Sequence, residues 1–209
     1  MIKLTEKRQG VILWILENKN RSWSIHELCT SLGGLTYPST YDFVNHLLEA
    51  GHLIRTQTRE FMLVNTRALI SQLAFTFPFK AKKKSSFFIK LGMKDKMSLL
   101  KDIKLDYALT AFAAAELLHP YVKTEKVHAY VRTRDIETWK KLLTKKNARP
   151  AYEDEANLFL LPVEENYYFK LSRKIHGFSI SPPGLVLADL ISIGGLGEEH
   201  AKVIEEGVR

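Results

Sequence analysis

The chain has 209 residues, of which 45% are hydrophobic and 26% charged, a composition typical of a globular protein and not of a disordered or fibrous one. Lys and Arg outnumber Asp and Glu by 31 to 23, giving a net charge of +8. The longest apolar run near the start, residues 11–16, is far shorter than the roughly 20 residues of a membrane-spanning helix, and no hydrophobic secretory block is present. Cys29 is the single cysteine, which excludes an internal disulfide and suits a reducing compartment. We therefore expect a cytoplasmic protein without a membrane partner.

The positive charge is concentrated in one half of the chain. Residues 1–104 contain 17 Lys and Arg against 8 Asp and Glu, a net charge of +9, whereas residues 105–209 contain 14 against 15, a net charge of −1. This asymmetry favours a polyanionic partner for the first half, most commonly nucleic acid. A solvated basic surface would give the same count, so local patterns must decide.

The first 50 residues carry the signals of three helices. Thr5 is a suitable N-cap for the first, whose apolar residues recur at helical spacing and which we expect to run to about residue 18. Ser24 and Glu27 have the S-x-x-E spacing of a capping box, which predicts a second helix that stops at a glycine pair. Residues 36–40 include a proline suited to the first turn of a third helix.

Two short strand-like runs, residues 53–57 and 61–64, follow the third helix and predict a hairpin. Two helices, a glycine turn, a third helix and a hairpin form the order typical of a winged helix-turn-helix, and the passage EAGHLIR at 49–55 resembles that family's junction between third helix and wing. The resemblance covers about residues 4–75, and we assign residues 1–78 to a winged helix-turn-helix DNA-binding domain. It implies that the third helix enters the major groove of double-stranded DNA while the wing follows the backbone or minor groove.

Side chains on the outer face of the third helix and on the wing are the candidates for DNA contact. A helix fits the major groove because the groove width matches its diameter, and Asn45 has the amide geometry that reads adenine. Arg55 and Arg59 on the wing are expected to pair with phosphates. The candidates in this domain are Thr36, Tyr37, Ser39, Tyr41, Asn45, Arg55 and Arg59.

Two acidic residues on the same side of the third helix argue for an alternative. Asp42 and Glu49 would repel phosphates unless they cap a backbone group or accept a hydrogen bond from cytosine. Some winged helices bind proteins, so a protein-interaction module without sequence-specific DNA binding remains an alternative function.

Residues 79–104 are interpreted as a basic linker and connector. Lys82, Lys83 and Lys84 stand in a short span and are expected to lie against DNA phosphates, with a plain solvated linker as the alternative. Within this segment, residues 87–91 are typical of a short strand and residues 94–104 of a polar connector or amphipathic turn, and membership of both in the second domain is the alternative to a linker.

Residues 105–209 predict a second, α+β domain. Helical patterns occur at residues 110–118, 135–143, 185–191 and 198–206, and strand patterns at residues 126–131, 157–161, 167–171 and 177–180. The overall fold class is therefore α+β, with an N-terminal winged helix-turn-helix domain followed by a mixed α/β C-terminal domain.

The second domain also resembles a known family. The motifs that carry the likeness are Tyr107-Ala-Leu-Thr110, Ala114-Ala115, Pro120-Tyr121, residues 127–131 and 157–162, Ser181-Pro182, Leu187-Ala-Asp-Leu190 and Gly195-Leu-Gly-Glu-Glu199. Together they resemble AbiEi-type antitoxins, the winged-helix transcriptional regulators of type IV toxin-antitoxin systems. Leu196 stands where family members often carry an arginine. The resemblance implies repression of the chain's own operon through promoter DNA and neutralisation of a nucleotidyltransferase-like toxin by the second domain.

Patterns that would indicate enzyme chemistry are incomplete. The glycines at 194–197 precede two glutamates and no P-loop lysine, which favours a helix start over a phosphate loop. His26 is followed by Thr30 where a zinc-protease helix needs a second histidine. A nuclease or nucleotidyltransferase built on Asp102 or Glu155 is the less favoured alternative. We expect a protein that is not an enzyme and that uses no cofactor or metal.

Overall fold

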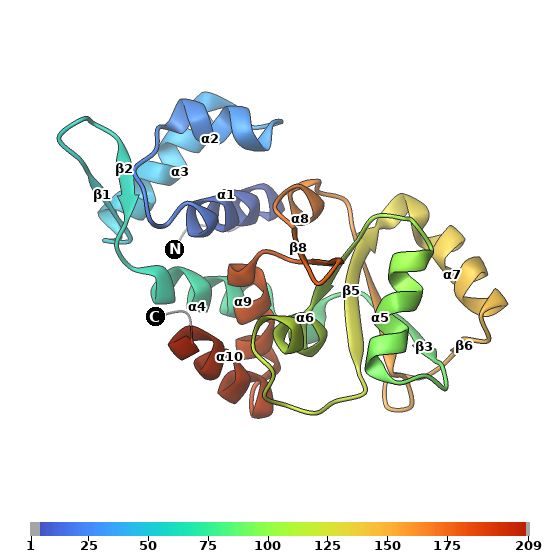
Figure 1. Ribbon diagram of the computed structural model, residues 1–209. Coiled ribbons are helices and arrows are strands. Elements are labelled where there is room, and N and C mark those ends of the chain that lie inside the picture. The colour runs from blue at the N-terminus through green and yellow to red at the C-terminus, as the bar shows by residue number, and fades with distance from the viewer. Residues whose placement is uncertain (1–4, 208–209) are drawn as a thin grey trace. The chain divides into compact units, whose positions relative to one another are not determined.

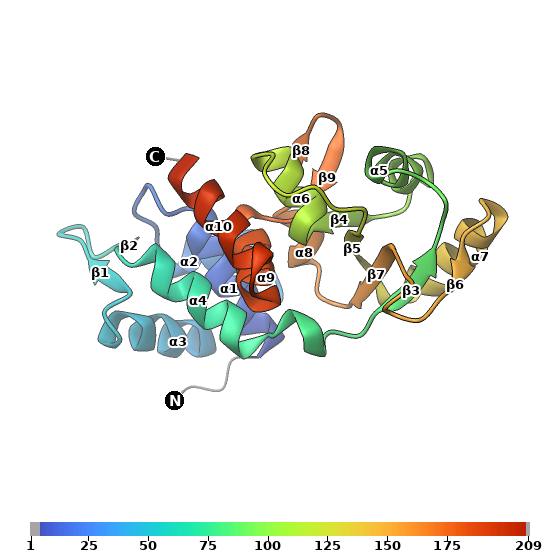
Figure 2. The ribbon, with the colours of Figure 1, turned by 90° about the horizontal axis from the view of Figure 1, so that it is seen from below.

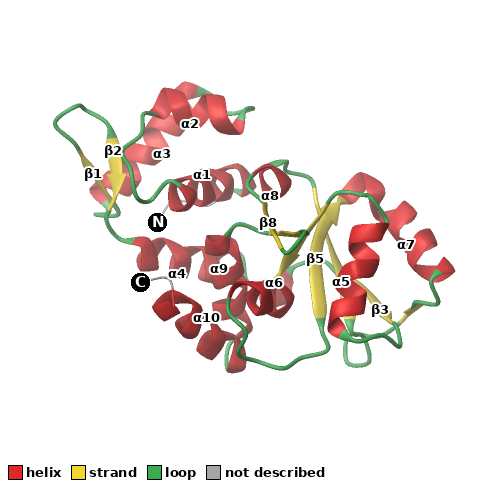
Figure 3. Ribbon diagram, in the orientation of Figure 1, coloured by secondary structure: helices red, strands yellow, loops and turns green. Residues whose placement is uncertain are grey.

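A computed structural model describes residues 5–207 (Figure 1). The chain divides between Thr76 and Phe77 into two compact units, which we call unit 1 and unit 2. Figure 3 shows that helices predominate in unit 1, whereas unit 2 combines a sheet with helices. The mixed α/β class expected from the sequence is confirmed.

Unit 1 consists of helices and a two-stranded hairpin in the predicted order. Its elements are α1 (Glu6–Glu17), α2 (Ile25–Leu32), α3 (Tyr37–Glu49), β1 (Leu53–Arg55), β2 (Phe61–Leu63) and α4 (Thr66–Thr76).

The first two helices begin where their caps predict. The Thr5 hydroxyl accepts a hydrogen bond from the Arg8 backbone N–H at 3.4 Å, and the Ser24 hydroxyl accepts one from the Glu27 N–H at 3.1 Å. The Glu27 carboxylate accepts a bond from the Ser24 backbone in return, so the capping box is complete. Gly33 ends α2 at a φ of +72°, a left-handed conformation that glycine adopts without strain.

Aromatic packing fixes the hairpin to the helices of unit 1. Leu53 pairs with Leu63 and Arg55 with Phe61 in the antiparallel register of β1 and β2. Phe61 exchanges two backbone hydrogen bonds with Trp23, in the loop before α2, and their rings stack at 5.5 Å. Trp23 in turn meets Trp14 of α1 edge to face at 5.5 Å. The hairpin is therefore held by the core and not only by its own two strands.

Unit 2 is built around a seven-stranded mixed sheet with the strand order β6-β3-β7-β5-β4-β9-β8 (Figure 2). Its strands are β3 (Ser85–Phe88), β4 (Tyr107–Thr110), β5 (Val127–Arg132), β6 (Arg149–Pro150), β7 (Leu158–Val163), β8 (Arg173–Ile175) and β9 (Phe178–Ile180). Its helices are η1 (Phe79–Ala81), α5 (Met93–Asp102), α6 (Ala111–Leu118), η2 (Thr133–Asp135), α7 (Ile136–Lys145), α8 (Tyr167–Lys170), α9 (Pro183–Ile193) and α10 (Leu196–Gly207).

The central strands are buried on both sides, which explains their nearly continuous apolar sequences. β5 pairs in parallel with β7 along its whole length, and antiparallel with β4. Residues 158–161 and 127–131 are buried without alternation, as expected for strands covered on both faces. α5 packs on β4, β5 and β9, while α6, α9 and α10 pack on one another.

Residues 79–104, predicted as a linker and connector, form part of the body of unit 2. β3 lies inside the sheet between β6 and β7, and its Phe87 is buried. The polar segment after it forms α5, which buries Met97, Leu100 and Lys96. Strand pairing that joins β3 to residues more than 60 positions away leaves no local signal in the sequence.

The strand predicted at residues 167–171 is wrong, because the structure has the short helix α8 there. Tyr167 and Tyr168 are both buried and stack at 4.4 Å, and Tyr168 also meets Tyr130 at 4.6 Å. Consecutive side chains of a strand would point to opposite faces, whereas a helical turn lets neighbouring residues bury together.

Candidate nucleic-acid interface

The outer face of α3 presents two of the predicted aromatic residues. Tyr37 and Tyr41 are 52% and 39% exposed, and their rings stack at 6.2 Å with an angle of 19°. The opposite face of the helix buries Phe43, Val44 and Leu47. The apolar spacing thus fixes which side chains of α3 remain available to a partner.

Tyr41 links this helix face to the hairpin. Hydrogen bonds with the Asn45 and Arg55 side chains, in that order of size, lower the pKa of the Tyr41 phenol below its usual value. Arg55 also makes a cation–π contact, since its guanidinium lies 5.1 Å from the centre of the Phe61 ring. Three of the predicted residues, from α3 and β1, therefore form one cluster, which we call the Tyr41 cluster.

Arg59 lies apart from the Tyr41 cluster, in the turn of the hairpin. It is exposed and adopts a left-handed φ of 64°, and its backbone N–H donates to the Thr56 carbonyl at 3.0 Å. The neighbouring Glu60 carboxylate accepts hydrogen bonds from Ser22 and Thr58. The acidic neighbour is thus engaged within the unit, while the arginine projects from the turn.

Thr36 and Ser39 face a different space from the Tyr41 cluster. They line a pocket between the N-terminal turns of α1 and α3, together with Lys7 and Arg8 of α1. These two cations are not among the residues predicted from the sequence. Their first-turn position was visible, but only the packing of α1 against α3 brings them to the predicted hydroxyl residues.

The acidic residues of α3 are in the expected positions. Asp42 is exposed, and the Glu49 carboxylate lies 3.7 Å from Nδ1 of His46 one turn earlier. Both carboxylates therefore remain on the solvent side of the helix.

The three lysines predicted to contact DNA have different environments. Lys82 donates to the Asp189 carboxylate at 2.6 Å and to the Tyr130 hydroxyl, and Lys84 forms an ion pair of 2.5 Å with Glu153. Lys83, between them, is exposed. These contacts commit two of the three cations to partners inside unit 2.

Asp189 is the centre of a buried polar cluster in unit 2. Its carboxylate also accepts hydrogen bonds from the Thr110 hydroxyl at 2.6 Å and the Tyr130 hydroxyl at 2.8 Å. Burial, followed by the Asp189 charge, raises the pKa of Tyr130. With donors from β4, β5 and the segment after η1, this carboxylate ties α9 to three separate parts of the unit.

No helix within residues 5–207 is long and apolar enough to span a bilayer. Across the same part of the chain, no group of three or more His, Cys, Asp or Glu side chains is arranged to hold a metal ion.

Comparison with known families places the chain among transcriptional regulators. Residues 62–208 match the family model described as transcriptional regulator, AbiEi antitoxin, type IV TA system. The chain belongs to this AbiEi antitoxin family of type IV toxin-antitoxin systems. The match covers the last two residues of β2, α4 and unit 2 as far as residue 208, and most of unit 1 lies outside it. No curated protein and no solved structure matches.

Proposed function

We propose that unit 1 is a winged helix-turn-helix that binds double-stranded promoter DNA and represses the chain's own operon. In this arrangement α2 and α3 form the helix-turn-helix, α3 enters the major groove and the β1–β2 hairpin is the wing. The observation that carries the proposal is the Tyr41 cluster, because it joins the exposed face of α3 to the wing.

The cluster gives each residue a separate task. Asn45 presents an amide for a base edge, and Arg55 is a cation beside it for a base or a phosphate. The exposed stacked rings of Tyr37 and Tyr41 supply apolar contact for a thymine methyl group. Arg59, at the turn, pairs with a backbone phosphate.

Unit 2 is proposed to neutralise a nucleotidyltransferase-like toxin by direct binding, without being an enzyme itself. Support comes from membership in the antitoxin family, whose match spans this unit. Within this unit, residues 105–209 have a net charge of −1, which fits a protein-binding role better than a second DNA-binding surface.

The salt dependence of DNA binding tests the first proposal. We expect affinity for duplex from the chain's own promoter to fall steeply with salt, because each neutralised phosphate adds about −0.9 to the slope of log affinity against log salt concentration. Arg59→Ala should reduce the magnitude of this slope by about 0.9, the value for one phosphate contact. Asn45→Ala should weaken binding to the promoter more than binding to unrelated duplex.

Lys19→Ala is the matched control, since Lys19 is an exposed cation of unit 1 in the turn that follows α1. It should leave affinity within about twofold of the wild type. A salt-independent titration with promoter duplex would contradict the proposal.

A protein-binding role for unit 1 is the second candidate, and Asp42 and Glu49 favour it. Both carboxylates stand on the solvent side of α3, and Ile54 of the hairpin is 43% exposed. Under this reading, the chain does not prefer promoter duplex to unrelated duplex, and Asn45→Ala and Arg59→Ala leave duplex binding unchanged. Ile54→Asp, in contrast, abolishes capture of a protein partner.

A further inference from the structure

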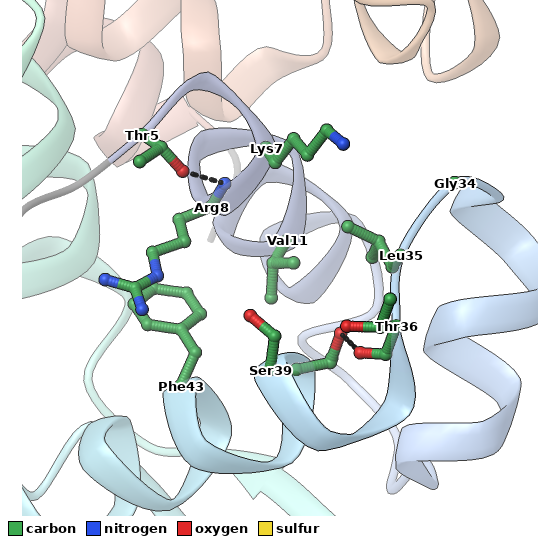
Figure 4. A pocket seen from close by; sticks show the side chains of 10 residues that line it. Thr5, Lys7, Arg8, Val11, Gly34, Leu35, Thr36, Ser39 and Phe43 are labelled. Carbon is green, nitrogen blue, oxygen red and sulfur yellow. Dashed lines mark hydrogen bonds between the residues drawn. The ribbon is translucent and has the colours of Figure 1, made fainter.

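One side of α3 is closed to a partner, and the other side is open. Figure 4 shows Phe43 pointing from α3 toward α1, and Phe43, Val44 and Leu47 are buried. Asp42 is exposed on the remaining side of the helix, as is Tyr41 one residue before it. A helix that is buried along one stripe presents the opposite stripe to its partners. Asp42 therefore belongs to the surface that the proposed function places in the major groove.

Asp42 stands beside the side chain that is proposed to read adenine. Asn45 follows three residues later, so the two side chains are neighbours on one face of the helix. Tyr41 gives a second link between them. Hydrogen bonds with Asn45 and then with Arg55 lower the pKa of the Tyr41 phenol, and the Asp42 charge opposes them. The Asp42 carboxylate thus lies within electrostatic reach of the Tyr41 cluster.

The two carboxylates on the outer face of α3 have different surroundings. Glu49 is the last residue of the helix, and its carboxylate lies 3.7 Å from Nδ1 of His46. The Asp42 carboxylate makes no ion pair or hydrogen bond with any residue in the described range 5–207. Asp42 is also closer to the N-terminus of α3, and the N-terminal residues of a recognition helix are those that contact base edges. Of the two acids, Asp42 has the free acceptor in position to meet a base.

The chemistry of a carboxylate selects one base of the major groove. An ionised carboxylate has two acceptor oxygens and no donor. Guanine presents acceptors to it, thymine an acceptor and a methyl group, and adenine a donor next to the N7 acceptor. Cytosine presents the N4 amino donor and no acceptor of its own. A carboxylate close to phosphates lowers affinity through like-charge repulsion, and a hydrogen bond from cytosine offsets that cost.

We propose that Asp42 is a specificity-determining residue that accepts a hydrogen bond from the N4 amino group of a cytosine in the operator. The proposal deepens and rests on the DNA-binding function proposed above. Three residues of a helix rise about 4.5 Å, close to the roughly 3.4 Å between successive base pairs. With α3 along the groove, Asp42 and Asn45 therefore address neighbouring base pairs, a C·G pair and an A·T pair.

Substitution of the promoter duplex, one base pair at a time, tests the assignment. A footprint of the wild type on duplex from the chain's own promoter defines the site, and each base pair within it is then replaced. At one C·G pair, next to an A·T pair, replacement should weaken wild-type binding about fivefold to tenfold. Asp42→Ala should lose this preference alone. It should also bind unrelated duplex at least as tightly as the wild type, because a charge that repels phosphates has been removed.

Two further changes examine the contact at the level of atoms. Asp42→Asn should move the preference at this pair from cytosine toward adenine, because an amide offers a donor as well as an acceptor. N4-methylcytosine at the same position replaces the amino hydrogen that faces the groove with a methyl group and keeps the base pair. This modified duplex should bind the wild type more weakly, whereas Asp42→Ala should bind it as well as the unmodified duplex.

Glu49→Gln is the charge-matched control, because it removes one carboxylate from the same face of the same helix. Its preference at every base pair should equal that of the wild type. Circular dichroism verifies that each variant is folded.

Three results would overturn the assignment, each in a different way. If the wild type prefers its promoter with a steep salt slope, and Asp42→Ala loses no preference for a C·G pair, the cytosine contact is wrong while the DNA-binding function stands. If the wild type binds no duplex, the proposed function and the cytosine contact fail together. If Asp42→Ala leaves DNA binding unchanged but abolishes capture of a protein partner, Asp42 belongs to a protein-binding surface.

Discussion

At the scale of single residues, His128 shows how strongly burial decides side-chain chemistry. It is 7% exposed, stacks on Phe159 at 4.5 Å and meets Phe79 edge to face at 5.1 Å. Burial, together with the charges of Lys84 and Lys126, lowers the pKa of His128 to about 3. The imidazole is therefore neutral in the folded protein at neutral pH and acts as a packing element of the core.

This burial predicts an acid-sensitive fold. An unfolded histidine titrates near pH 6.5, so between pH 6.5 and 3 the unfolded chain binds the proton that the folded chain excludes. The free energy of unfolding should consequently decrease as the pH falls through this window, with a contribution of up to about 1.4 kcal/mol per pH unit. Denaturant titrations at pH 6.5, 5.5 and 5.0 measure it, above the range where most carboxylates titrate.

His128→Phe, which keeps the aromatic stack, should flatten the decline between pH 6.5 and 5.0. His26→Gln, at an exposed position, is the control and should leave the decline unchanged. An equally steep decline in His128→Phe would show that other groups cause it.

At the scale of elements, the segment after η1 is an anchored part of unit 2. Lys82 and Asp189 are 16% and 2% exposed at their side chains, and the pair joins the segment to α9. The backbone N–H of Phe79 donates to the Ser192 hydroxyl of the same helix at 2.7 Å. The run of lysines is typical of a flexible linker, but Lys82 is fixed by its ion pair with Asp189, which lies more than 100 residues later in the chain.

The Lys82–Asp189 ion pair predicts that substitutions of the adjacent lysines Lys82 and Lys83 differ sharply in their effect on stability. Lys82→Met should lower the free energy of unfolding by about 3 kcal/mol, because it leaves a buried carboxylate without its cation. Lys83→Met, at the exposed neighbouring position, should change it by less than about 0.5 kcal/mol. Urea unfolding measures both, and the double variant Lys82→Met/Asp189→Leu should recover part of the loss. Equal free energies of unfolding for Lys82→Met and Lys83→Met would contradict a stabilising role of the Lys82–Asp189 ion pair.

At the scale of the whole molecule, the two units divide the proposed tasks. Most of the cation excess of the first 104 residues lies in residues 77–104, which belong to unit 2 and hold 9 Lys and Arg against 2 Asp and Glu. The family match spans unit 2 together with α4 and the last two residues of β2. Each unit has its own buried core, centred on Trp23 in unit 1 and on strands β5 and β7 in unit 2. Separate cores allow a surface change in one unit without unfolding the other.

This division predicts that repression and toxin neutralisation can be separated by mutation. Asn45→Ala combined with Arg59→Ala should relieve repression of a promoter reporter at least tenfold, while protection of cells from the cognate toxin is retained. The two readouts are reporter activity and survival on toxin induction, and Lys19→Ala should leave both unchanged. Simultaneous loss of both functions in a folded double variant would show that they share one surface.

The sequence by itself determined the elements whose signals are local. The Thr5 and Ser24 caps, the glycine turn and the apolar spacing of α3 act within a few residues, so the helices and hairpin of unit 1 follow from them. Only the tertiary structure decided what depends on distant partners: the burial of Lys82 on Asp189, the place of β3 in the sheet, and α8 in place of a strand. The tertiary structure also decided that Lys7 and Arg8 of α1 line the same pocket as Ser39 of α3. Contacts between residues far apart in the chain arise from packing and charge pairing in three dimensions, and no short window of sequence contains both partners.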